Sequence, residues 1–146
     1  MSDIGTTPAA QEPVFRVRAE VRHRILLVRC GGVVTADDLV ALESSARCFV
    51  RQCGPVPTIV DLSAVSRVAV PTAQVVALAQ RPPIMGDQTR VYVVPIAEAF
   101  GLTRLYAAYQ ELAGFKPPKM ARTLEEALRL LGLDDRGLRP SSLAAD

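Results

Sequence analysis

The residues best suited to chemistry gather in the stretch VDLSAVSRVAVPTA, at positions 60–73. Asp61 stands near the end of a short apolar run that predicts a buried strand. Open α/β sheets bind ligands at the carboxyl ends of their parallel strands, so Asp61 could orient a substrate or a metal ion. It could equally accept backbone N–H bonds from the following turn, where Ser63 and Ser66 are ordinary turn residues. We favour the turn role.

Thr72 follows Pro71 at the start of the next helical pattern and places a hydroxyl at a helix amino terminus. A phosphate there would be stabilised by backbone N–H groups and by the helix dipole, so Thr72 is a candidate phosphosite. The simpler interpretation is a first-turn hydroxyl that bonds nearby backbone or water, because Pro71 suits the first position of a helix. A partner-binding surface around this corner would comprise Asp61, Ser63, Ser66, Arg67 and Thr72.

Motifs typical of enzymes are absent from the sequence, which lacks G-x-S-x-G, a Walker phosphate loop and G-x-G-x-x-G. The only histidine, His23, falls in a hairpin turn without an acid or nucleophile at a recognisable spacing. Two acidic pairs, at 37–38 and 125–126, begin helices, where capping and the helix dipole explain them. We therefore predict a protein that is not an enzyme and that uses no metal and no cofactor.

The cysteines favour a reducing compartment. The chain has three cysteines, Cys30, Cys48 and Cys53, and no C-x-x-C pair. This odd number and spacing indicate neither a disulfide framework nor a zinc site. Cys30 falls in an apolar strand and Cys53 on an apolar helical stripe, which predicts buried reduced thiols. No apolar run reaches the roughly 18 residues that a membrane span needs. A cytoplasmic protein without a membrane span is the resulting expectation.

Charge does not identify a partner by itself. Seventeen basic and fifteen acidic side chains give a net charge of +2, which does not predict a nucleic-acid partner. Arg16, Arg18 and Arg22 lie at even spacing in the first strand and would share one sheet face. Such a row could bind an acidic protein or an anionic head group, but a solvated edge that prevents sheet-to-sheet aggregation is the favoured role.

Hydrophobic periodicity predicts one α/β domain over residues 14–133, between loose tails at 1–13 and 134–146. The order is β-β-α-β-α-β-α-β-α, with a mostly parallel mixed sheet whose first strand is antiparallel. Gly31-Gly32 is expected to end the second strand. The predicted strands are 15–21, 24–30, 58–62, 90–94 and 119–122, and the predicted helices are 36–52, 70–80, 97–112 and 124–131.

Several segments together resemble a known family. The hairpin, GGVVTADDL, VDLSAV, VYVVPIAEAFGLTRLYAAY and ARTLEEALRLLG look like the STAS domain, and more narrowly the bacterial SpoIIAA-like or STAS/SEC14-like proteins. The resemblance spans about residues 15–132. It implies a small non-enzymatic regulatory module that binds a protein partner, as anti-sigma factor antagonists do. It leaves the partner and the oligomeric state open.

The family's phosphorylation switch is not preserved in this chain. In anti-sigma factor antagonists the strand leads to an Asp-Ser-Ser-Gly turn, whose second serine a kinase phosphorylates. The matching positions here are Ala69, Val70, Pro71 and Thr72. Proline cannot accept phosphate, so we expect the usual serine switch to be absent, and only Thr72 could replace it.

The SEC14-like side of the resemblance implies an alternative function, the binding of a small apolar ligand. Phe100, Leu105, Tyr106 and Tyr109 of the predicted helix 97–112 could line such a pocket. Their helical spacing makes core packing the default interpretation. The apolar stripe that we expect this helix to bury consists of Phe100, Leu102, Leu105, Ala108 and Leu112.

Overall fold

A five-stranded sheet organises the chain, in the order β1-β2-β3-β4-β5. The computed structural model describes residues 15–20 and 24–133. The tails predicted at 1–13 and 134–146, and with them Arg22 and His23, lie outside the described residues. The strands are β1 (Phe15–Glu20), β2 (Ile25–Thr35), β3 (Thr58–Ala69), β4 (Arg90–Val93) and β5 (Lys119–Ala121), and the described helices are α2 (Ala36–Cys53), α3 (Thr72–Ala79), α4 (Ala97–Leu112) and α5 (Leu124–Leu130).

Strand pairing confirms the predicted α/β class and the mixed sheet. β1 pairs antiparallel with β2, and the pairs β2–β3, β3–β4 and β4–β5 are all parallel. A helix connects each parallel strand to the next, which is the usual connection between adjacent parallel strands. Within the described part of the chain, no helix is long and apolar enough to cross a membrane.

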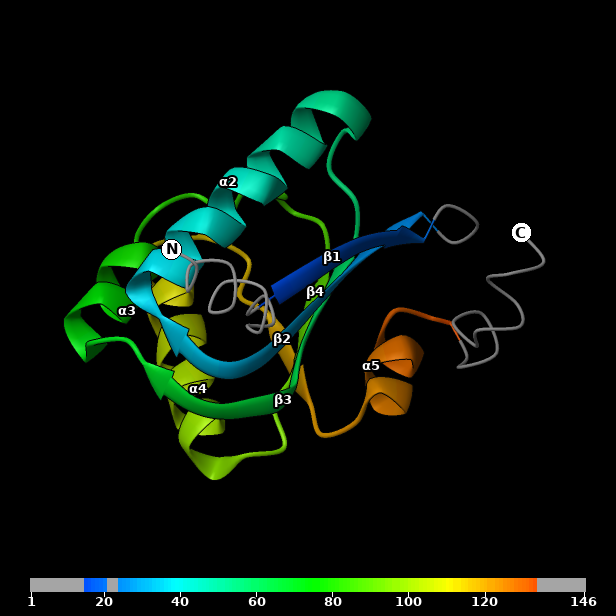
Figure 1. Ribbon diagram of the computed structural model, residues 1–146. Coiled ribbons are helices and arrows are strands. Elements are labelled where there is room, and N and C mark those ends of the chain that lie inside the picture. Colours follow the sequence, from blue (N-terminus) through cyan, green and yellow to red (C-terminus); the bar gives the residue numbers. More distant parts are fainter. Residues whose placement is uncertain (1–14, 21–23, 134–146) are drawn as a thin grey trace, which may run out of the picture.

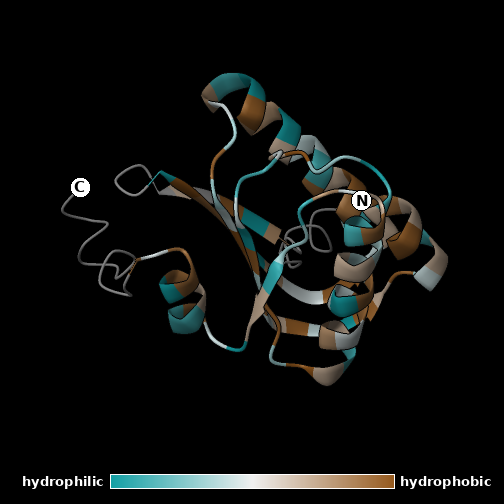
Figure 2. Ribbon diagram, turned by 180° about the vertical axis from the view of Figure 1, so that it is seen from behind, coloured by the Kyte–Doolittle hydropathy of each residue, from teal (hydrophilic) through white to brown (hydrophobic). Residues whose placement is uncertain are grey.

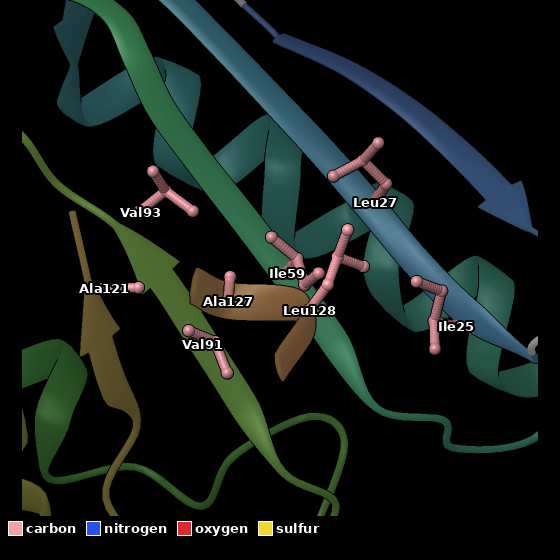
Figure 3. Packing of buried hydrophobic residues seen from close by; sticks show 8 residues of the cluster. All are labelled: Ile25, Leu27, Ile59, Val91, Val93, Ala121, Ala127 and Leu128. Carbon is pink, nitrogen blue, oxygen red and sulfur yellow. The ribbon is translucent and has the colours of Figure 1, made fainter. Parts of the chain in front are cut away.

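Helices cover both faces of the sheet, but unequally (Figure 1). α2, α3 and α4 lie on one face, and the short α5 lies on the other. Figure 3 shows Ala127 and Leu128 of α5 over the side chains of Ile59 and Val91, with α2 behind the sheet. Side chains alternate between the faces along each strand, so odd positions 25, 27 and 59 meet α5, whereas even positions 26, 28 and 60 face α2.

Two threonines begin helices as the sequence suggests. The Thr35 hydroxyl accepts the Asp38 N–H at 3.3 Å, and the Asp38 carboxylate accepts the Thr35 N–H at 2.7 Å, which forms a full capping box. At α5, the Thr123 hydroxyl accepts the Glu126 N–H at 3.1 Å. The Glu126 carboxylate instead accepts from the Arg122 backbone at 2.8 Å, so this box is only half formed.

The second and third strands are longer than predicted. Gly31 and Gly32 do not end β2; they lie at two register shifts within a parallel ladder that continues to Thr35 opposite Ala69. A Cβ on Gly31 would meet the Cβ of Ala64 at 3.4 Å, and Gly32 has a φ of 69°, which suits bulges. β2 and β3 thus extend together beyond the last residue of β4 (Figure 1).

The buried face of α4 differs from the predicted stripe, although its bounds, 97–112, are as predicted. Leu112 is 80% exposed and Ala108 is also exposed. The buried residues are Ala99, Thr103 and Gln110, at spacings of four and seven. Polar side chains can occupy this face because the Thr103 hydroxyl donates to the Ala99 carbonyl at 2.8 Å and the Gln110 carbonyl accepts from Arg90 at 2.7 Å.

Candidate functional site

Helix α2 covers the sheet without burying any of its own residues. Four of its apolar side chains, Leu39, Leu42, Phe49 and Val50, pack against the core but remain partly exposed. Figure 2 shows hydrophilic and hydrophobic residues mixed along this helix. Close-packed interfaces normally seal the apolar stripe of a helix, so this arrangement leaves apolar space between α2 and the sheet.

Two adjoining chambers occupy the space between the sheet and α2, α3 and α4. The first has a volume of about 140 Å³ and the second about 120 Å³. An engineered apolar cavity of about 150 Å³ stays dry and binds benzene, so each chamber is about the size of a small apolar group. Both chambers share walls formed by Leu39, Leu42, Val60, Leu78, Tyr92 and Tyr106.

The two chambers differ in polarity. The second chamber is lined by aliphatic and aromatic side chains, apart from Cys30 and Thr103. The first also includes Arg90 and Thr58, and an ion pair between Arg81 and Glu43 at 3.2 Å lies in its wall. The Arg81 side chain is 55% exposed, so this pair marks the rim of the first chamber.

Burial keeps two titratable groups of the cavity neutral. It raises the pKa of the Cys30 thiol from 9.0 to about 11, together with a smaller contribution from the nearby Asp61 carboxylate. Burial also raises the pKa of Tyr92, with a second contribution from Tyr106, whose ring centroid is 6.2 Å away. A protonated thiol and a neutral phenol disfavour nucleophilic chemistry in these walls.

One of the four predicted pocket residues lines the cavity. Tyr106 belongs to both chambers, whereas Leu105 and Tyr109 line neither. Phe100 lies in a separate surface depression, where the Arg122 guanidinium stands 5.5 Å from its ring. The prediction placed the pocket on α4 alone, but the structure forms the cavity from the sheet and three helices.

Asp61 lies within β3 rather than at its end, which corrects the predicted position. Its Oδ1 accepts from the Ser63 backbone N–H at 3.0 Å and from the Ser63 hydroxyl at 2.5 Å. Its Oδ2 lies 3.6 Å from Nε of Arg29, its neighbour across the β2–β3 ladder. Asp61 is buried, with 8% of the residue exposed, and its carboxylate accepts a backbone N–H as expected, but the donor belongs to a continuing strand and not to the predicted turn.

The predicted corner surface divides into buried and exposed parts. Ser63, Ser66 and Arg67 are exposed on β3, and Thr72 is exposed as the first residue of α3. Pro71 takes the position before the helix, not its first residue as predicted, with extended backbone at ψ 141°. Asp61 alone is buried, so the five residues do not form one continuous exposed patch.

The arginine row of β1 is described only in part. Arg16 is exposed and lies opposite Arg29 in the β1–β2 ladder. The side chain of Arg18, like the whole of Arg22, lies outside what the structure describes. β1 is the edge strand next to β2, as the interpretation of a solvated edge requires.

Cys53 corrects the prediction of a buried thiol. It and Cys48 are exposed, whereas Cys30 is buried as expected. Cys53 ends α2, the helix that buries none of its residues, so an apolar stripe in sequence did not lead to burial here. Over residues 15–20 and 24–133, no group of three or more His, Cys, Asp or Glu side chains could hold a metal ion.

Arg90 and Leu78 are two of the cavity residues that sequence reasoning missed. Arg90 reads as an ordinary strand start, although it shares its face with Tyr92 two residues on. Leu78 stands four residues before the Pro82-Pro83 helix stop and gives no signal beyond apolarity. No protein-family model matches the chain, and no curated protein matches it.

Proposed function

We propose that this protein is a non-enzymatic binding module that holds a small apolar ligand between its sheet and the helices α2, α3 and α4. The observation that carries the proposal is the pair of adjoining chambers, about 140 and 120 Å³, with predominantly apolar walls. Ligand sites are concave and mostly apolar, with a few placed polar groups. This cavity has that character, with Arg90 and Thr58 as its polar groups.

A STAS/SEC14-like relationship is the finer part of this proposal. It is supported by the antiparallel first strand, the parallel strands linked by helices, and the Asp61-Leu62-Ser63 sequence in β3. The interpretation as a regulator without the usual serine switch is supported by Pro71. Regulation and ligand binding are compatible, because a ligand bound under α2 would alter the surface presented to a partner.

Binding of a small neutral fluorescent probe, 1-naphthylamine, tests the proposal, because the volume of its two fused rings matches that of the two chambers together. We expect saturable binding to the wild-type protein, with a blue-shifted emission that reports an apolar site. Leu78→Phe should weaken binding about tenfold or more, because Leu78 lines both chambers and the larger ring fills them.

Leu105→Phe is the matched control, since Leu105 is partly buried on α4 but lines neither chamber. It should bind the probe like the wild type. The proposal fails if the wild-type protein does not bind the probe, or if both variants bind it equally well while remaining folded by circular dichroism.

A second candidate function is protein binding through the extension of β2 and β3. Val33 is 44% exposed there and pairs in register with Arg67, which is also exposed. Exposed Thr72 lies just beyond the strand end. Thr72→Glu and Arg67→Glu should both weaken recovery of a specific partner from the native cell; unchanged recovery with both variants would exclude this surface.

A further inference from the structure

Arg90 is a buried cation in the wall of the first chamber. It is 8% exposed and begins β4, on the face of the sheet that α2, α3 and α4 cover. Its Nη1 donates to the Tyr106 hydroxyl at 3.2 Å, and its Nη2 donates to the Gln110 side-chain carbonyl at 2.7 Å and the Lys116 backbone carbonyl at 2.6 Å. All three partners are neutral oxygen atoms.

The charge of Arg90 has no counter-ion within the described residues. The ion pairs there join Arg29 to Asp61, Arg81 to Glu43 and Arg129 to Glu125, and none involves Arg90. A guanidinium offers five N–H donors, so two of them find no acceptor in this part of the chain. Buried charges are normally paired, because removing an ion from water is costly.

The neighbouring charges cannot supply the missing anion. Glu43 also lines the first chamber, but both of its carboxylate oxygens accept from Arg81, at 3.2 and 3.3 Å. That pair is exposed at the rim, whereas Arg90 is buried. An anion that reached Arg90 through the first chamber would therefore meet an uncompensated positive charge in an apolar setting, where the attraction is stronger than in water.

We infer that the ligand of this cavity is a medium-chain carboxylic acid, whose carboxylate binds Arg90 and whose tail occupies the second chamber. The inference rests on the proposed function and adds the chemical class of the ligand. Scaling from benzene in a cavity of about 150 Å³, the two chambers together would take roughly ten carbon atoms. The aliphatic walls of the second chamber suit the tail, and the free donors of Arg90 suit the head.

Calorimetry with octanoate and 1-octanol, at a pH where the acid is ionised, distinguishes the contribution of the charged head group to binding from that of the apolar tail. The two probes share the same apolar chain and differ in charge. We expect the wild-type protein to bind octanoate about tenfold or more tightly than 1-octanol, since a hydrogen bond to a charged group exceeds a neutral one by that order. Arg90→Gln should remove this preference and leave binding of 1-octanol within about twofold.

Arg81→Gln is the matched control, because Arg81 lines the same chamber but its charge is already paired. It should keep the preference for octanoate. Equal affinity of the wild-type protein for both probes would overturn the inference while the proposed function stands. A preference that survives Arg90→Gln, or one that Arg81→Gln removes, would also overturn it, and failure of both probes to bind would overturn the proposed function as well.

Arg90 holds the side chains of Tyr106 and Gln110 and the carbonyl of Lys116 together, so Arg90→Gln could unfold the protein. A measurement on the wild-type protein avoids this problem. Octanoate labelled with carbon-13 at its carboxyl group should titrate with a lower pKa when bound than when free, because the guanidinium favours the carboxylate. An unchanged or raised pKa of the bound acid would contradict the inference. Arg90→Lys, which keeps the charge, should retain part of the preference for octanoate.

Discussion

Paired Val→Leu substitutions on opposite faces of the sheet test whether the cavity is empty space. Val60 in β3 is 9% exposed and lines both chambers. Val91 in the adjacent β4 is fully buried under α5, in the cluster shown in Figure 3, and lines neither chamber. Each substitution adds one methylene group and removes a β-branched residue from a strand, so the loss of strand propensity is similar in both.

The free energy of unfolding should change in opposite directions. At Val60 the added methylene enters existing apolar space, and burying it contributes about 0.8 kcal/mol of stability. At Val91 it enters a packed cluster, where an extra methylene costs about 1–3 kcal/mol. The two variants should therefore differ by about 2–4 kcal/mol, a large part of the about 5–15 kcal/mol that a domain has in total.

Urea unfolding followed by circular dichroism measures this difference. With a slope of about 1–3 kcal/mol per molar urea, the midpoints should separate by about 0.7 M or more, at an unchanged slope. The reasoning is refuted if Val60→Leu destabilises the protein as much as Val91→Leu does, because the chambers would then be filled in solution. Val60→Ala, which enlarges the cavity, should lower stability and checks that the site is sensitive.

Three further results are expected. Leu128→Ala should lower the free energy of unfolding by about 3 kcal/mol in the same urea assay, because Leu128 is fully buried and anchors α5; a loss below about 1 kcal/mol would contradict this. Stability should fall as the pH rises from 9.0 towards about 11, because the unfolded chain then loses the Cys30 proton that the folded state retains. Cys30→Ser should flatten that dependence, and at pH 8 a thiol reagent should modify Cys48 and Cys53 much faster than Cys30.

Local signals predicted most of the fold. The capping residues Thr35 and Thr123 and the bounds of helix 97–112 depend on neighbours within a few residues, and the structure has each of them as predicted. The predicted lengths of β2 and β3 were too short, because the true lengths depend on pairing between two segments that lie far apart in the sequence. The Gly31-Gly32 pair is typical of a strand end in sequence, but in the structure the β2–β3 pairing continues past it through register shifts of the β-bulge type.

The cavity could not be predicted from the sequence for a different reason. A helix that seals its apolar stripe and one that leaves space beneath it can have the same spacing of leucines, so Leu39 and Leu42 give no signal of a cavity. The sequence also gives no sign that Arg90 is buried. Its burial depends on Gln110 and on the carbonyl of Lys116, which lie 20 and 26 residues further along the chain. Only Tyr106 was identified beforehand, from the family resemblance rather than from a packing argument.

The unequal packing of the two faces determines where a ligand could act on the fold. On the α5 face, Ala121 and Ala127 are small enough for helix and sheet to meet closely, and both are essentially inaccessible. On the other face, α2 is fixed by its Thr35 cap and by partly exposed contacts, without a buried anchor of its own. A ligand in the chambers would give α2 the apolar contacts that it lacks. By mass action, a ligand at about 100 times its dissociation constant adds about 2.7 kcal/mol to the stability of the folded state, and contacts with Leu39 and Leu42 would place part of that gain at α2.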